Sequence, residues 1–300
     1  MKKPKRKIAK KVTAKKTGRK LVKKLSKAVA KKSTKKISKK STAKEKRPAA
    51  KMQHPFIWHD LMTPDVAAAK KFYGDVVGWT FSDNMPNYTV NLAGGFGMGG
   101  IMEMPAEMKG MPPVWTGYVY VPNVDAACKQ AVKLGGKILR PAWDVPEVGR
   151  MAVIGDSTGA SLIIMKPART GAQPLPKPGA MGTLGWNELH ADDLGKAWNF
   201  YSKMFGWSKG ETMNMGAMGN YQLFQIKKQD LGGMMKKSGD TPRATWAYYF
   251  MVDGIDAAVS RLTNGGGKVT MGPHQVPGGQ WVVMATDPHG GSFALTSENK

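Results

Sequence analysis

The chain contains nearly the same ten residues twice. "FYGDVVGWTF" occupies residues 72–81, and "FYSKMFGWSK" occupies residues 200–209, which lies 200 − 72 = 128 positions later. Solenoid and propeller repeats recur at roughly 20–50 residues. The longer spacing therefore indicates two copies of a whole domain. Two further pairs follow the same plan: Trp58 with Trp186, and Trp115 with Trp246.

Each copy is predicted to be an α+β domain built from two βαβββ units. In the first copy, strands and one helix are expected in the order 56–62, 64–77 (the helix), 78–82, 87–92 and 97–104, and the pattern restarts with strand 115–121 and helix 123–136. Residues 167–182 are rich in Pro, Gly and Ala, as an interdomain linker should be. We therefore predict domains at 54–166 and 183–297.

The positive charge of the chain is concentrated at its N-terminus. Residues 1–51 contain 24 Lys or Arg against the single acid Glu45, a balance of +23 out of the +25 of the whole chain. The rest is near neutral, at 25 − 23 = +2. Residues 1–53 contain no aromatic side chain, so this tail is predicted to be disordered when free. Its composition resembles the lysine-rich tails of linker histones and bacterial histone-like proteins.

Dense lysine blocks bind polyanions because they release counterions from the phosphate backbone. We therefore expect the tail to bind DNA or RNA without sequence preference; a solubilising or targeting role is the alternative. The lysines assigned to this contact are Lys15, Lys16, Lys23, Lys24, Lys31 and Lys32. The single cysteine, Cys128, and the lack of a secretion signal or membrane span predict a cytoplasmic protein, nucleoid-associated if the tail meets DNA, with no membrane partner.

Several motifs together resemble one known superfamily. These are "FYxxxxGW" in a first helix, "V-x-x-V/I-D-A-A" opening a second, and the closing segments "GDSTGASLII" and "TDPHGGSFAL". Their order is similar to that of the vicinal oxygen chelate superfamily, which has the glyoxalase/bleomycin-resistance/dioxygenase fold. The resemblance covers residues 54–297 and points to two-domain bacterial glyoxalase-like proteins. It implies that each pair of βαβββ units curls its sheet into a cup.

The resemblance also implies where metal ligands would stand. In metal-bearing members, a His or Gln opens a first strand and a Glu lies in a closing strand. The corresponding positions here are Trp58, Thr116 and Ile163 in the first copy, and Trp186, Ala247 and Ala294 in the second. Such side chains cannot hold a cation, so we expect no metal and no cofactor. A shift of one residue in register would instead bring His59 forward.

Strand alternation predicts what lines the cups. Trp58 and Asp60 share one face with Tyr118 and Tyr120, while in the second copy Trp186, Glu188, His190 and Tyr249 share the equivalent face. An aromatic pocket holding one acid is a candidate binding site. Glu188 and His190 are candidate catalytic residues, because an acid beside an imidazole can move protons. The alternative is that both carboxylates only hold the cup in shape.

Three functions remain open at this point. The first is a protein that binds a small molecule in an aromatic cup without the usual metal, similar to bleomycin-resistance proteins. The second is an enzyme, a lyase, isomerase or hydroxylase-like member, that uses Glu188 and His190 or displaced metal ligands. The third makes the tail the main functional element and the body its anchor.

Overall fold

The computed structural model describes residues 54–169, 176–177, 179–239 and 241–300, all of which lie in the same unit of the chain. The predicted tail, residues 1–53 with its six assigned lysines, lies outside the described residues. Part of the predicted linker lies outside them too, namely 170–175 and 178. The disorder of the tail and the domain boundaries stay predictions.

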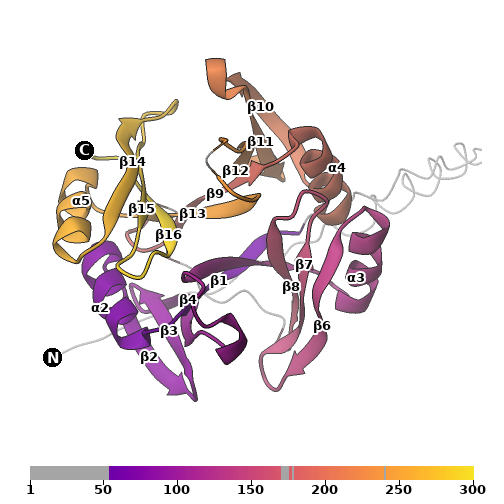
Figure 1. Ribbon diagram of the computed structural model, residues 1–300, viewed down its shortest axis with the longest axis horizontal. Coiled ribbons are helices and arrows are strands. Elements are labelled where there is room, and N and C mark those ends of the chain that lie inside the picture. The colour runs from indigo at the N-terminus through magenta and orange to yellow at the C-terminus, as the bar shows by residue number, and fades with distance from the viewer. Residues whose placement is uncertain (1–53, 170–175, 178, 240) are drawn as a thin grey trace, which may run out of the picture. The chain divides into compact units, whose positions relative to one another are not determined.

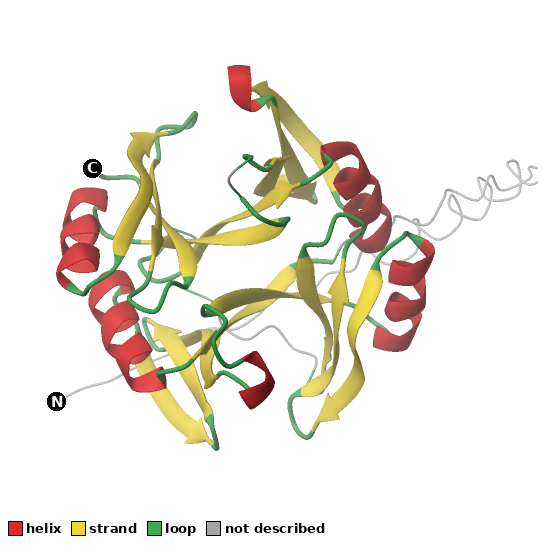
Figure 2. Cartoon of the chain, viewed as in Figure 1, coloured by secondary structure: helices red, strands yellow, loops and turns green. Residues whose placement is uncertain are grey.

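The first half of the unit contains two βαβββ runs (Figures 1 and 2). The first run is β1 (Phe56–Thr63), α2 (Val66–Val77), β2 (Thr80–Met85), β3 (Tyr88–Ala93) and β4 (Phe96–Glu103), followed by the short 3₁₀ helix η1 (Ala106–Met108). The second run is β5 (Val114–Tyr120), α3 (Val124–Lys133), β6 (Lys137–Val145), β7 (Gly149–Gly155) and β8 (Ser161–Pro167).

The second half repeats this order. Its first run is β9 (Leu184–Ala191), α4 (Leu194–Phe205), β10 (Ser208–Asn214), the 3₁₀ helix η2 (Gly216–Met218), β11 (Asn220–Ile226) and β12 (Gln229–Lys236). Its second run is β13 (Thr245–Met251), α5 (Ile255–Asn264), β14 (Lys268–Gln275), β15 (Trp281–Thr286) and β16 (Ser292–Ser297).

Each half forms one eight-stranded mixed sheet. The strand order is β2-β3-β4-β1-β5-β8-β7-β6 in the first sheet and β10-β11-β12-β9-β13-β16-β15-β14 in the second. The two first strands of a half lie side by side and antiparallel at the centre, β1 with β5 and β9 with β13. The predicted α+β fold of four βαβββ units is confirmed.

The repeated helices α2 and α4 begin and end in the same way. Asp65 and Asp193 each cap the first turn of their helix. Their side chains accept the backbone N–H groups of Ala68 and Lys196, respectively, at 2.9 Å. Gly78 and Gly206 end the helices with φ of 82° and 73°, a left-handed conformation that favours glycine. The "GW" of the repeated motif therefore marks a helix end followed by a buried tryptophan.

The hydrophobic core is shared by the two halves, and hydrogen bonds cross between them in matched pairs. Trp79 Nε1 donates to the carbonyl oxygen of Gly182, and Trp207 Nε1 donates to that of His54, both at 2.7 Å. The Tyr73 hydroxyl donates to Asp287 at 3.1 Å. Helices α2 and α5 contact each other, as do α3 and α4 (Figure 1).

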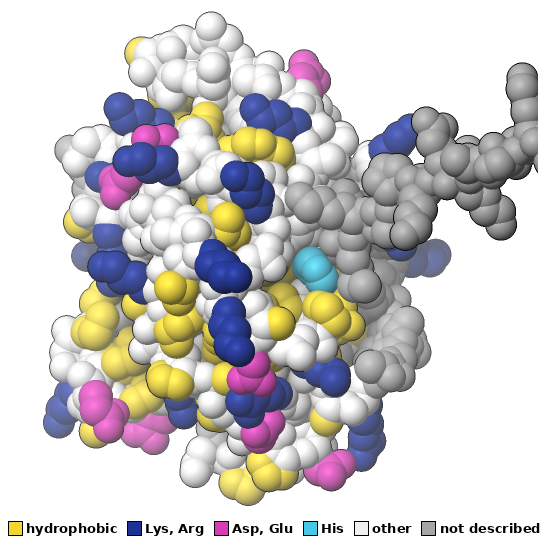
Figure 3. Space-filling model, turned by 90° about the vertical axis from the view of Figure 1, so that its right-hand side faces the viewer, with side chains coloured by type: hydrophobic (Ala, Val, Ile, Leu, Met, Phe, Trp, Pro, Cys, Tyr) yellow, Lys and Arg dark blue, Asp and Glu magenta, His cyan; other side chains and the backbone are white. Residues whose placement is uncertain are grey.

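The surface of the unit carries charges of both signs. On the face shown in Figure 3, Lys and Arg side chains stand beside Asp and Glu side chains. This mixture agrees with the small net charge of the sequence beyond residue 51. Among the described residues, no helix is long and apolar enough to cross a membrane.

Candidate functional site

The strand register defines one face of each sheet. In the first sheet Trp58 stands opposite Tyr118, which stands opposite Ile163, and Asp60 stands opposite Thr116. Directly opposed residues on neighbouring strands point to the same face. We call this face the first cup. The second cup is the equivalent face of the second sheet, where Tyr249 stands opposite both Trp186 and Ala294, and Glu188 stands opposite Ala247.

Asp60 lies at the centre of a hydrogen-bonded network in the first cup. Its Oδ2 accepts from the Tyr118 hydroxyl at 2.5 Å, and its Oδ1 accepts from the Tyr88 hydroxyl at 2.7 Å. Trp58 Nε1 donates in turn to the Tyr88 hydroxyl oxygen at 2.6 Å. Asp60 is buried, so these hydroxyls take the place of water around its carboxylate.

Glu188 has the same surroundings in the second cup. Its Oε2 accepts from the Tyr221 hydroxyl at 2.6 Å and its Oε1 from the Tyr249 hydroxyl at 2.9 Å. Trp186 Nε1 donates to the Tyr221 hydroxyl oxygen at 2.7 Å. Each cup therefore contains the same chain of indole, phenol, carboxylate and phenol.

His190 adds an imidazole to the second cup. Its Nε2 lies 2.8 Å from Glu188 Oε1, and only about a tenth of either side chain is exposed, at 12% and 10%. This nitrogen has no well-aligned hydrogen-bond partner among the described residues, so the contact is a close approach of an imidazole and a carboxylate. Met62 occupies the corresponding position of the first cup, 128 residues earlier. The two cups differ chemically at this point.

The different surroundings shift the pKa values of the two carboxyl groups in opposite directions. Burial raises the pKa of Asp60, and the Tyr118 and Tyr88 hydroxyls offset this only in part. Burial acts on Glu188 as well, but His190 and the two tyrosine hydroxyls outweigh it, so the pKa of Glu188 is lowered. Asp60 therefore takes up a proton more readily than an ordinary aspartate, and Glu188 holds its charge.

Glycines make room for the two tyrosines that approach the carboxylates from β3 and β11. A Cβ on Gly100 would lie 2.0 Å from the Tyr88 hydroxyl oxygen, and one on Gly233 would lie 2.1 Å from ring atoms of Tyr221. Real Cβ contacts are never that short, so any side chain here would displace the ring. The glycines of "MGGIM" and "LGGMM" thus have a local steric function in the cups.

Sequence reasoning missed Tyr88 and Tyr221. A signal was present, because both follow an asparagine at the start of the strand, in "NYTV" and "NYQL", and both have a Gly-Gly pair on the next strand. Of the expected ligand-binding residues, Trp58, Asp60 and Tyr118 come together. Tyr120 lies two residues further along β5, opposite Met165, and its ring centroid is 5.9 Å from that of His54.

His59 lies on the opposite face of the first sheet from the cup. Its Nε2 is 3.3 Å from Asn187 Oδ1 of the second half, and its ring packs edge-on against Tyr248. Burial lowers the pKa of His59 to about 4, with the Asn187 contact opposing the shift. The register therefore keeps Trp58, and not His59, in the cup. No group of three His, Cys, Asp or Glu side chains suited to a metal occurs in the described part of the chain.

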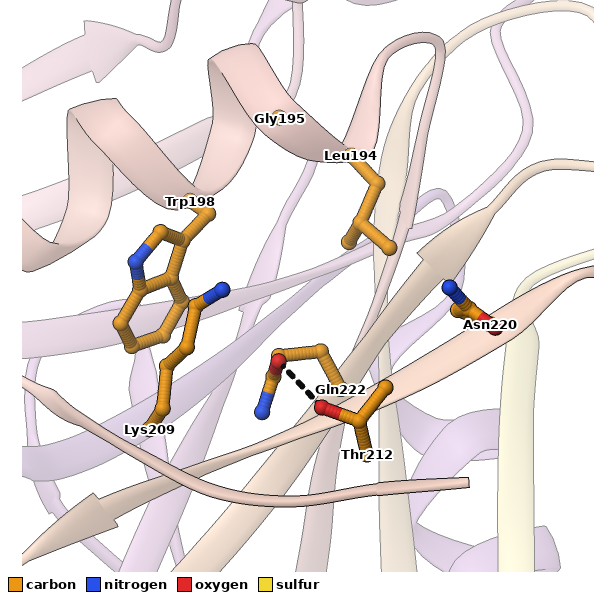
Figure 4. A pocket seen from close by; sticks show the side chains of 7 residues that line it. All are labelled: Leu194, Gly195, Trp198, Lys209, Thr212, Asn220 and Gln222. Carbon is orange, nitrogen blue, oxygen red and sulfur yellow. Dashed lines mark hydrogen bonds between the residues drawn. The ribbon is translucent and has the colours of Figure 1, made fainter. Parts of the chain in front are cut away.

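Two surface hollows occur outside the carboxylate networks. One, of about 400 Å³, lies between α4 and strands β10 and β11 (Figure 4). In it, Thr212 donates to Gln222 at 2.7 Å, and the Lys209 ammonium lies 5.3 Å from the Trp198 ring centroid. The first half has a matching pair, Lys70 over Phe81. A pair present in both halves and away from the cups indicates a structural role.

The second hollow, of about 430 Å³, borders the first cup. It lies between the end of β2 and the β6–β7 turn, where Met85 and Val148 line it. Val148 also packs against the apolar cluster of the first cup, which contains Tyr118, Met151, Ile163 and Met165. This hollow therefore shares Val148 with the apolar cluster of the first cup.

Comparison with known proteins places the chain among relatives of one kind. A family model described as "Glyoxalase/Bleomycin resistance protein/Dioxygenase superfamily" matches residues 183–295, and one described as "Bleomycin resistance protein-like N-terminal" matches residues 56–91. "Putative glyoxylase CFP32" of Mycobacterium tuberculosis is 34% identical over 244 residues, covering 79% of this chain and 92% of the relative. "Anthracycline biosynthesis protein DauV" of Streptomyces sp. is 32% identical over 257 residues, covering 79% and 91%.

Solved structures share the fold at low sequence identity. The Mn(II)-bound glyoxalase from Novosphingobium aromaticivorans superposes with a TM-score of 0.58 at 16% identity, covering 83% of each chain. An extradiol ring-cleaving dioxygenase from B. fuscum superposes with a TM-score of 0.60 at 16% identity, covering 84% of this chain and 74% of that chain. At this level the likeness concerns the fold alone.

Proposed function

Because the chain belongs to the glyoxalase/bleomycin resistance protein/dioxygenase superfamily, we propose that it binds a small planar aromatic molecule in its cups, without the metal that other members carry. The observation that carries the proposal is which residues stand at the positions where metal-binding members have their ligands. Trp58 and Trp186 stand there, and their indole nitrogens are already engaged with Tyr88 and Tyr221. Indole, hydroxyl and alkyl groups supply no ligand set for a cation, so the residues do not fit a metal.

The apolar lining of the cups supports an aromatic ligand. Met85 stands opposite Tyr88, and Met213 stands opposite Tyr221 at the same place in the second sheet. Methionine is flexible and polarisable and makes favourable contacts with aromatic rings. A flat ring system laid against Trp186 would thus meet adaptable side chains around it and one polar group, Glu188, to orient it.

The relatives support the same class of ligand. Two of them are named for anthracycline biosynthesis, and the anthraquinone part of an anthracycline consists of three fused, planar rings. Such rings bury a large area and stack offset on indole faces. We therefore assign to this chain a ligand with fused, planar aromatic rings.

Titration of the full chain with anthraquinone-2-carboxamide, followed by equilibrium dialysis, tests the proposal. We expect saturable binding that Trp186→Ala or Trp58→Ala weakens by about tenfold for the cup concerned. Trp198→Ala is the matched control, because Trp198 lies on α4 outside the cups. Equal affinity in all four proteins, or no binding, would refute the proposal.

A second candidate function is proton transfer in the second cup. The observation that favours it is the 2.8 Å separation of His190 Nε2 and Glu188 Oε1, which has no counterpart in the first cup. An ionised carboxylate beside an imidazole can hold the ring in position while the imidazole takes a proton from a bound substrate or returns one. In this account the enzyme would be a lyase or isomerase and Glu188 would position His190.

Substitution of His190 by methionine, the residue found at the equivalent position 62, tests this second candidate. With anthrone as the probe, whose C10 protons are acidic, His190→Met, which copies the first cup, should abolish exchange of those protons with solvent deuterium, as followed by NMR, if the second cup moves protons. Binding should remain. Proton exchange that is equally fast in His190→Met and wild type would exclude the role.

The lysine-rich residues 1–53 form the third part of the proposal. Their charge balance of +23 over residues 1–51 supports non-specific binding of DNA or RNA phosphates by the lysines named above. In the combined account, the tail holds the protein at a polyanion while the cups take up the small molecule.

A further inference from the structure

Arg140 and Trp143 form a stacked pair on the wall of the first cup. The guanidinium carbon of Arg140 lies 3.8 Å from the centroid of the Trp143 ring. Trp143 itself packs against the apolar cluster that contains Tyr118. A guanidinium on an indole face is held by cation–π attraction and keeps its hydrogen-bond donors free at its edge. The pair therefore fixes a cation beside the aromatic lining of the cup.

Irregularities in β6 direct both side chains to the same face. Residues three apart on a regular strand point to opposite faces. Here the register shifts on both sides of Arg140, so that Arg140 stands opposite Val153 and Trp143 stands opposite Met151. Both partners belong to the residues that form or pack on the apolar cluster of the first cup. Bulges of this kind re-aim side chains and are frequent next to binding sites.

The charge of Arg140 is not neutralised by a carboxylate. Within the described ranges, no Asp or Glu lies at ion-pair distance from it, whereas three other arginines have such partners: Arg150, Arg169 and Arg261. The charge of Arg140 instead influences Tyr118, a side chain of the first cup. Burial raises the pKa of Tyr118, and the charge of Arg140 opposes that rise, so the guanidinium lies close enough to influence the hydroxyl that contacts the carboxylate.

The second cup lacks this cation. The repeat offset of 131 puts Met271 at the position of Arg140 and His274 at that of Trp143. Met271 stands opposite Met284, just as Arg140 stands opposite Val153. The strand pairing at this position is therefore the same in both cups, but only the first cup has an arginine there.

We propose that the first cup binds an aromatic carboxylate, with the ring system against Trp58 and the carboxylate held by Arg140, which Trp143 supports. Guanidinium and carboxylate form two parallel charge-assisted hydrogen bonds, which is stronger and more directional than a neutral contact. The inference rests on the proposed function, since it names the charge class of the ligand taken by one of the two cups.

The test compares two probes of the same shape on the full chain, anthraquinone-2-carboxylate and anthraquinone-2-carboxamide, at about 0.15 M NaCl to screen distant charges. Arg140→Gln should weaken carboxylate binding at the first cup by about tenfold and leave carboxamide binding unchanged. Arg243→Gln is the matched control, because it removes the same charge from an exposed position outside the strands. Trp58→Ala and Trp186→Ala assign each binding event to its cup.

Met271→Arg provides the reciprocal experiment, since it should give the second cup a preference for the carboxylate. Equal loss of both probes in Arg140→Gln, or equal effects of Arg140→Gln and Arg243→Gln, would overturn this inference while leaving the proposed function intact. Failure of both probes to bind wild-type protein would overturn the proposed function, and this inference with it.

Discussion

His190 Nε2 lies 2.8 Å from Glu188 Oε1 in the second cup, and Met62 stands in the equivalent place beside Asp60 in the first. Each cup also contains a tryptophan, two tyrosines and a buried carboxylate. Burial raises the pKa of Asp60, whereas His190 and the two tyrosine hydroxyls outweigh burial at Glu188 and lower its pKa. The duplicated halves have therefore become chemically different within a conserved framework.

Asp60→Asn should gain stability relative to the wild type as the pH rises. Because the folded pKa of Asp60 lies above its ordinary value of 3.8, its contribution to stability is fully present below that pH and is lost as the pH rises through the folded pKa. Asparagine does not titrate, so its contribution to stability does not change with pH. The measurement is the free energy of unfolding in urea from acidic to neutral pH, and the difference should grow by at most about 1.4 kcal/mol per pH unit.

Glu188→Gln should show the opposite trend. The folded pKa of Glu188 lies below its ordinary value of 4.5, so its contribution is present above that pH and is lost as the pH falls through the folded value. The variant should be less stable than the wild type at neutral pH, and the gap should narrow under acid. Parallel pH profiles for the two variants would contradict the assigned surroundings of Asp60 and Glu188.

Gly100→Ala should destabilise the protein by about 1–3 kcal/mol, the usual cost of overpacking. The backbone there does not require glycine, but the new methyl group would collide with the ring of Tyr88. Urea denaturation measures the cost, and ultraviolet difference spectra of tyrosine report whether the ring has left Asp60.

Tyr88→Ala is the control for the glycine experiment, because it removes the obstacle. Adding Gly100→Ala to that variant should cost much less than adding it to the wild type, since neighbouring residues couple in a double-mutant cycle. The same cost in both backgrounds would mean that the glycine is needed for another reason.

Binding of duplex DNA, if carried by the tail, should depend steeply on salt. A contact with about eight phosphates predicts a slope of about −7 in a plot of log binding constant against log salt concentration. Deletion of residues 1–51 should abolish binding, because the remaining chain carries a net charge of only +2. Undiminished binding by the truncated protein would locate the contact in the body.

Much of the fold was predictable because the repeat constrains it. Motif order indicated four βαβββ units, and strand alternation placed Trp58 and Asp60 on one face, which the register with Tyr118 and Thr116 confirms. Those inferences need only local periodicity. The pairing of β1 with β5 follows from the arrangement of the units and requires no knowledge of side-chain contacts.

The contacts that complete the cups depend on distant parts of the chain. Tyr88 reaches Asp60 only because β4 provides Gly100 beneath its ring, which no periodicity in β3 reveals. Arg140 and Trp143 violate simple alternation, since a bulge between them reverses the expected faces. His59, expected as a substitute ligand under a shifted register, contacts Asn187 of the other half.

Ligand binding after removal of metals shows whether the cups need a cation to hold an aromatic molecule. Full-length protein is dialysed against a chelator, its content of Zn, Mn, Fe and Ni is measured, and the affinity for anthraquinone-2-carboxamide is determined on the same sample. We expect the same affinity before and after dialysis, and a lower affinity in Trp186→Ala. Binding that disappears with the metal and returns when about one equivalent per half is restored would contradict it.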